Sequence, residues 1–169
     1  MTTTASAPTI AGWRLGRRAR NAILTIHIAV SVGLLGDSAG FLAVAIQRAV
    51  SDDPAFVDAT HDLLGTFALA FGIPLSFLAL LTGIALGLGT PWGVFRYPWV
   101  VAKLVLIVTV IAVGAIVLRP VLADDTAGSG RLIVGAAYDV VALTVATALA
   151  VFKPGRARAA ARRSTANGH

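Results

Sequence analysis

The chain of 169 residues is too apolar for an ordinary soluble protein. Hydrophobic residues make up 57% of it and charged residues 13%, against about 45–50% and about 25% in soluble domains. It has no cysteine, which excludes disulfides, cysteine-ligated zinc and iron–sulfur clusters. The net charge of +6 is concentrated just before the first apolar run and just after the last, so we expect no nucleic-acid partner.

A polar tail, residues 1–20, opens the chain and ends in a basic cluster of four arginines. We expect this tail to be disordered. The apolar run that follows is longer than the roughly 7–15 residues of a signal-peptide core, so we interpret it as a retained membrane span.

Four apolar runs follow one another along the chain, at about 22–46, 63–89, 99–118 and 132–152. Each reaches the roughly 20 residues that a helix needs to cross a bilayer. The sequence therefore predicts a membrane domain over residues 21–153, followed by a basic tail over 154–169.

Prolines and acidic residues divide the runs. An acidic segment, residues 51–60, separates the first two, and Arg119–Pro120 is predicted to end the third. Pro74 lies inside the second run, where it should kink the helix or leave a backbone carbonyl without a partner.

Short connections make each span antiparallel to its neighbour in sequence. The predicted fold is therefore all-α: a polytopic membrane protein built as an antiparallel up-down bundle of four transmembrane helices. The pairs Gly36/Gly40 and Gly83/Gly87 have the G-x-x-x-G spacing that favours close helix packing.

Basic residues set the predicted orientation. They gather in both tails, whereas the connections after the first and third spans are rich in aspartate. The positive-inside rule then places both termini in the cytoplasm. The basic tails should also attract anionic lipid headgroups of the bilayer.

Five ionisable groups lie inside the spans or at their mouths: His27, Asp37, His61, Lys103 and Asp139. A charge at mid-bilayer costs about 2.5–3.5 kcal/mol on insertion scales, so each is a functional candidate if it faces the bundle interior. For Lys103 the alternative is a side chain that snorkels to the headgroups. For His27 it is a neutral imidazole bonded to a neighbouring helix.

The candidates lie at two different depths in the membrane. At about 1.5 Å per residue, His27 lies about 8 Å inside the first span, and Lys103 lies at a similar depth in the third. Asp37 is deeper, and Asp139 enters from the other side by about 10 Å. We expect Asp37 to be protonated, paired, or exposed to a water-filled outer pocket with Asp139 and His61.

Two stretches carry a family resemblance: residues 24–30 read LTIHIAV, and residues 92–104 read WGVFRYPWVVAKL. The chain resembles a group of small four-span proteins of unknown function from the bacterial inner membrane. It is similar, more distantly, to the copper-resistance CopD-type membrane domain and to HemJ-type protoporphyrinogen oxidases. The matching positions are His27, Trp99 and Lys103. The resemblance implies that His27 and Lys103 take part in haem b binding and catalysis, with His27 as the candidate iron ligand.

The leading prediction is an inner-membrane protein, not an enzyme, that binds haem or another small molecule between helices near His27 and Lys103. Three alternatives stay open. One is a haem-dependent porphyrin or quinone oxidoreductase. Another is a proton or ion pathway through Asp37 and Asp139. The last is an accessory subunit of a membrane complex, and a homo-oligomer is equally compatible with the sequence.

Overall fold

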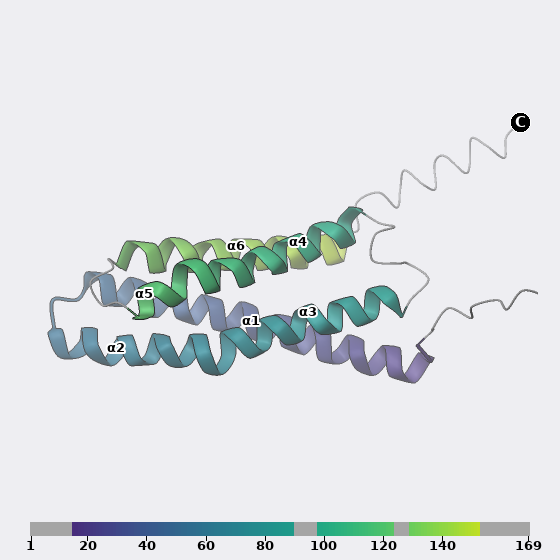
Figure 1. The fold of residues 1–169 in the computed structure, drawn as a ribbon, viewed down its shortest axis with the longest axis horizontal. Helices are drawn as coiled ribbons and strands as arrows, with labels where there is room; N and C mark the ends of the chain where they lie inside the picture. The colour runs from purple at the N-terminus through teal and green to yellow at the C-terminus, as the bar shows by residue number, and fades with distance from the viewer. Residues whose placement is uncertain (1–14, 90–97, 124–128, 153–169) are drawn as a thin grey trace, which may run out of the picture.

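The computed structural model describes residues 15–89, 98–123 and 129–152, which form four long helical spans (Figure 1). The first span is α1 (Arg17–Val50) and the fourth is α6 (Ser129–Phe152). The second span contains α2 (Pro54–Thr66), the π-helix η1 (Phe67–Gly72) and α3 (Ile73–Leu88). The third contains α4 (Pro98–Val113), the π-helix η2 (Gly114–Leu118) and α5 (Arg119–Ala123).

The spans form the predicted up-down four-helix bundle. Helix α1 packs against α3 and α6, and α4 packs against the same two helices, so α1 and α4 lie on a diagonal. The bundle has a basic end, where α1 begins and α6 ends, and an acidic end, where α1 leads into α2 through residues 51–53 (Figure 1).

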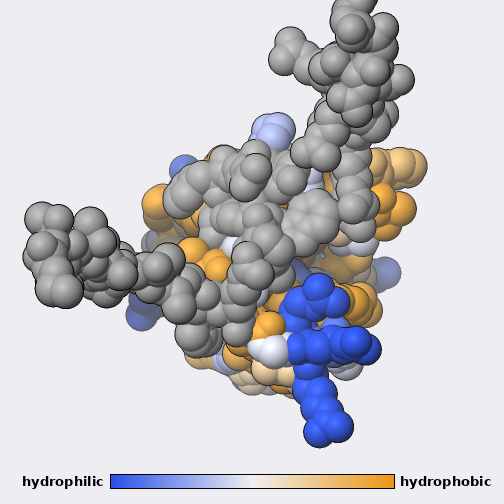
Figure 2. All heavy atoms as spheres, turned by 90° about the vertical axis from the view of Figure 1, so that its right-hand side faces the viewer, coloured by the Kyte–Doolittle hydropathy of each residue, from blue (hydrophilic) through white to orange (hydrophobic). Residues whose placement is uncertain are grey.

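The outside of the bundle is apolar. All four spans are long and apolar enough to cross a membrane, and only 6–33% of the most apolar window of each is buried. Ile116 is 73% exposed and Leu69 is 65% exposed. Figure 2 shows apolar side chains around the rim of the basic end, with hydrophilic side chains gathered at the start of α1. An apolar surface of this extent is stable in lipid, which identifies a multi-pass membrane protein.

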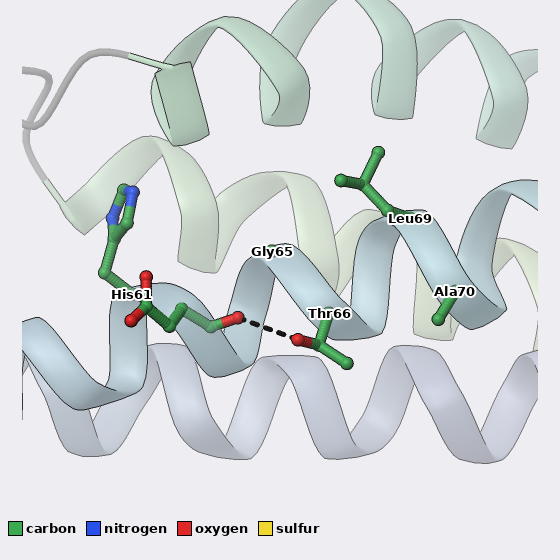
Figure 3. Close-up of a pocket in the computed structure, with 6 residues that line it drawn as sticks. His61, Gly65, Thr66, Leu69 and Ala70 are labelled. Carbon is green, nitrogen blue, oxygen red and sulfur yellow. Dashed lines mark hydrogen bonds between the residues drawn. The ribbon is translucent and has the colours of Figure 1, made fainter.

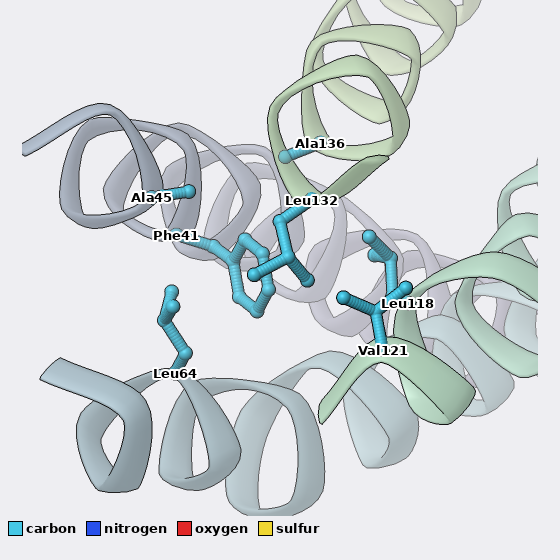
Figure 4. Packing of buried hydrophobic residues seen from close by; sticks show 7 residues of the cluster. All are labelled: Phe41, Ala45, Leu64, Leu118, Val121, Leu132 and Ala136. Atoms are coloured by element: carbon cyan, nitrogen blue, oxygen red, sulfur yellow. The ribbon is translucent and has the colours of Figure 1, made fainter. Parts of the chain in front are cut away.

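Two apolar clusters fill the interior. The acidic-end cluster joins all four spans (Figure 4), and its buried members are Phe41, Ala45, Leu64, Leu118, Val121, Leu132 and Ala136. The basic-end cluster is made of Val30, Leu34, Ala79, Val110, Ala142 and Leu143. The interior between these two clusters contains the buried polar residues Ser38 and Asp139.

The second span begins earlier than its apolar run. Helix α2 starts at Pro54, and Asp53 caps it by accepting a hydrogen bond from the backbone N–H of Ala55 at 3.0 Å. Proline suits the first helical position because the N–H that it lacks would have no partner there. The acidic segment 51–60 is therefore mostly helix, and only residues 51–53 connect the first two spans.

Both π-helical segments end just before a proline. The N–H of Ile73, which precedes Pro74, bonds to the carbonyl of Ala68. The N–H of Arg119, which precedes Pro120, bonds to a carbonyl at the same spacing. A proline ring clashes with the carbonyl four residues earlier, and a widened turn relieves the clash. The expected disturbance at Pro74 is thus a π-helical turn.

The sequence predicts that the third span ends at Arg119–Pro120, but the structure differs. The span continues as helix to Ala123. The π-helical turn before Pro120 explains the difference, since it allows the chain to pass the proline without leaving the helix axis.

Candidate functional site

Glycines let α1 and the second span approach closely. Four times along this antiparallel interface, a larger side chain of one helix lies against a glycine of the other. Such small-residue contacts are the usual means of close packing between membrane helices. From the basic end, the pairs are His27 with Gly83, Leu75 with Gly33, Asp37 with Gly72, and Phe67 with Gly40.

One glycine of each G-x-x-x-G pair therefore packs against a helix of the same chain. A methyl group on Gly83 would lie 3.3 Å from the Cε1 atom of His27, and one on Gly40 would lie 3.2 Å from the Phe67 ring. Gly36 has open space around it. In the described residues, two of the four glycines serve the contact between the first two spans.

His27 points toward the second span. Its Nδ1 atom lies 2.8 Å from the Oγ1 atom of Thr82. Lys103, on the diagonal helix α4, is close enough for its charge to act on the imidazole. The ammonium of Lys103 lies over the ring of Trp99, 4.8 Å from the centroid, a cation–π geometry. The structure thus gathers His27, Trp99 and Lys103 near the basic end.

Asp37 lies deeper, where α1 crosses the π-helical turn. Its Oδ2 atom would be 3.2 Å from a methyl group on Gly72, so the carboxyl group fills the space beside that glycine. Its Oδ1 atom is buried and has no hydrogen-bond partner among the described residues. The absence of a side chain at residue 72 makes room for this carboxyl group.

Asp139 is the most buried ionisable side chain in the described structure, at 7% exposure. Its Oδ1 atom also lacks a hydrogen-bond partner within the described ranges. On α6 it follows Ala136, which belongs to the acidic-end cluster, and precedes Ala142, which belongs to the basic-end cluster. Asp139 therefore lies between the two clusters.

Asp37 has the corresponding position on α1. Leu34 on one side belongs to the basic-end cluster, and Phe41 on the other belongs to the acidic-end cluster. Ser38, next to Asp37 on α1, is also buried. We call these three side chains the polar layer: Asp37, Ser38 and Asp139.

The groove beside His61 does not bring together the residues of the predicted outer pocket. His61 does line a surface groove of about 530 Å³ near the acidic end, together with Asp62, Gly65, Thr66, Leu69 and Ala70 (Figure 3). Neither Asp37 nor Asp139 lines this groove. Asp37 lies instead beside Gly72, at the contact between α1 and η1.

The described residues do not fit an enclosed haem. The edge of the His27 ring is packed against Thr82 and Gly83. The two grooves near the acidic end are not lined by His27. In the described ranges, no group of three or more His, Cys, Asp or Glu side chains could hold a metal ion without a porphyrin.

Sequence reasoning found the ionisable residues and missed their partners. Thr82 and Gly72 carry no signal in the sequence, because the second span is apolar on every face. Gly83 has a signal, as part of a G-x-x-x-G pair, but the pattern does not reveal that a histidine lies against it.

Comparison of the chain with models of known protein families, with curated proteins and with solved structures finds no match. The resemblance to CopD-type and HemJ-type domains, and the haem that it implies, stay predictions.

Proposed function

We propose that this is a bacterial inner-membrane protein that passes protons through its helix bundle, with Asp37 and Asp139 as the proton-carrying groups. One observation carries the proposal. Two carboxyl groups lie in the interior between the apolar clusters, and each has a buried oxygen with no hydrogen-bond partner in the described structure.

A structural role explains these carboxyl groups poorly. A buried polar group without a partner destabilises a protein by about 1–3 kcal/mol, and an apolar side chain of the same shape would avoid that loss. Within the described residues, no cationic side chain donates a hydrogen bond to the buried Oδ1 atom of either carboxyl group. Ionisable groups retained in a membrane interior are by default functional.

The polar layer suits protons better than metal cations. Calcium takes six to eight oxygen ligands and magnesium takes six in an octahedron. No cluster of three acidic or histidine side chains exists in the described ranges. A proton needs only one carboxyl oxygen, so separate carboxyl groups on different helices are sufficient.

The next protonatable side chain toward the basic end is His27, ten residues before Asp37 on α1. That spacing corresponds to roughly 15 Å along a helix, too far for direct transfer. Water molecules must bridge it. The π-helical turn beside Asp37 supports this route. Backbone hydrogen bonding that departs from the α-helical pattern at membrane depth leaves backbone carbonyls available to water.

Proton flux into liposomes tests the proposal. The full chain is reconstituted, a potassium diffusion potential is applied, and a trapped pH-sensitive dye reports proton entry. We expect flux in the wild type and at least about a tenfold loss in Asp37→Asn and in Asp139→Asn, as for proton-transfer groups. Asp62→Asn is the matched control, because Asp62 is exposed in the groove.

Two results would contradict the proposal. One is wild-type flux equal to that of empty liposomes. The other is equal flux in all four proteins. Absorbance in the Soret region that disappears in His27→Ala would instead support the haem site that the family resemblance implies.

We also propose that both termini are cytoplasmic. The bundle has its first and last helix ends on one side, and Arg17, Arg18 and Arg20 are exposed there at the start of α1. Basic residues beside spans favour the cytoplasmic side and its anionic headgroups.

A further inference from the structure

The hydroxyl of Thr82 makes its shortest hydrogen bond to its own helix. Its hydroxyl donates to the carbonyl of Leu78 at 2.6 Å, with the carbonyl of Ala79 as a longer alternative at 3.2 Å. A threonine hydroxyl has one hydrogen to donate. Because that hydrogen is directed at its own helix, the Oγ1 atom can only accept from any other group that approaches it.

His27 is the group that approaches. Its Nδ1 atom lies 2.8 Å from Thr82 Oγ1. Because the Thr82 hydroxyl donates to its own helix, the hydrogen of this bond belongs to Nδ1. This partner on α3 therefore demands an N–H from the ring at Nδ1.

A neutral imidazole carries one N–H, so protonation of Nδ1 leaves Nε2 with a lone pair. From this geometry we infer that Thr82 is a positioning residue, which holds His27 in the Nδ1–H tautomer and thereby makes Nε2 the atom that accepts a proton. The tautomer stands on the contacts alone. Its role in proton transfer rests on the proton pathway proposed above.

The inferred step is balanced in protons. A proton that binds Nε2 converts the neutral ring to imidazolium, while Nδ1–H stays bonded to Thr82. Release of a proton from Nε2 restores the same neutral tautomer. Thr82 takes no part in the transfer itself. Without Thr82, the ring could carry its hydrogen on Nε2, and Nε2 would then have no lone pair to accept a proton.

Nitrogen NMR of the full chain in lipid bilayers tests the inference. Histidine labelled with ¹⁵N is incorporated, and spectra are recorded at mildly alkaline pH, where protonated and unprotonated ring nitrogens give separate signals. The chain has three histidines, so His27→Gln identifies the signals of His27. We expect an N–H at Nδ1 and an unprotonated Nε2 in the wild type.

Two variants at residue 82 separate positioning from packing. Thr82→Val keeps the shape but removes the hydroxyl, and should lower the ratio of Nδ1–H to Nε2–H tautomer by about fivefold or more, the effect of one net hydrogen bond. Thr82→Ser keeps the hydroxyl and should keep the wild-type ratio. Proton flux should follow the same order.

A wild-type His27 protonated at Nε2, or at both nitrogens, would overturn the inference. So would an unchanged tautomer ratio in Thr82→Val, since Thr82 would then not set the tautomer. If the wild type has the Nδ1–H tautomer but shows no proton flux, the tautomer assignment holds and the proposed function fails. The two failures are therefore distinguishable.

Discussion

The carboxyl group of Asp37 lies against Gly72, at the last residue of the π-helical turn in the second span. A methyl group at residue 72 would come within 3.2 Å of Oδ2 and 3.5 Å of the carbonyl oxygen of Phe67. A turn with altered backbone hydrogen bonding, a glycine and an ionisable side chain thus meet at one depth. π-helical turns of this kind are frequent at functional sites.

Gly72→Ala should displace Asp37. The added methyl group requires the carboxyl group to shift by a few tenths of an ångström, and we expect lower proton flux together with a stability loss of about 1 kcal/mol, the lower range for overpacking. Gly36→Ala is the matched control, because nothing lies within 4 Å of its added methyl group. Thermal unfolding in detergent and liposome flux measure the two effects.

The control should be neutral or stabilising, since alanine exceeds glycine in helix propensity by up to about 1 kcal/mol. If both variants behave alike in flux and in unfolding, the contact between Asp37 and Gly72 has no particular importance.

Asp139→Leu should stabilise the fold while abolishing flux. Leucine has nearly the shape of aspartate and removes a buried oxygen that has no partner in the described structure. We expect the free energy of unfolding to rise by about 1–2 kcal/mol. Asp62→Leu, at an exposed position, should change stability little. Lower stability in Asp139→Leu would show that the carboxyl group makes a structural hydrogen bond.

Leu64→Ala should weaken the bundle far more than a matched change on the lipid face. Leu64 is fully buried in the acidic-end cluster, whereas Ile116 is 73% exposed. A cavity at Leu64 should lower the free energy of unfolding by about 2–4 kcal/mol. Ile116→Ala should lower it by less than about 1 kcal/mol, because lipid chains replace the lost contacts. Equal losses would contradict the packing of the cluster.

The sequence predicted the four spans because bilayer length and apolar composition identify a membrane helix directly. It did not predict where the helices end. Asp53 and Pro54 are a capping pair whose effect extends α2 through an acidic segment. Pro120 normally terminates a helix, but the π-helical turn before it does not follow from hydropathy.

The sequence predicts how deep each site residue lies in the membrane, but not the direction in which its side chain points. His27, Asp37 and Asp139 can be placed along their helices by residue counting, since the rise per residue is constant. Residue counting does not show which face of each helix points into the bundle. In a soluble helix the apolar face marks the core, whereas lipid and core are both apolar here. The contacts of Asp37 with Gly72 and of His27 with Thr82 therefore emerge only from the folded bundle.

Reporter fusions should place both termini in the cytoplasm. Helix α1 begins and α6 ends at the same end of the bundle, so the two termini share a side. Nine basic residues in the tails favour the cytoplasmic side for it: Arg14, Arg17, Arg18, Arg20, Lys153, Arg156, Arg158, Arg162 and Arg163.

A reporter that is active only in the cytoplasm should work when fused after Gly155. The same reporter fused after Gly128, behind three spans, should be inactive, and a periplasmic reporter should show the reverse pattern. A periplasmic reporter that is active after Gly155 would invert the orientation, and His27 would then lie near the periplasmic side of the proton route.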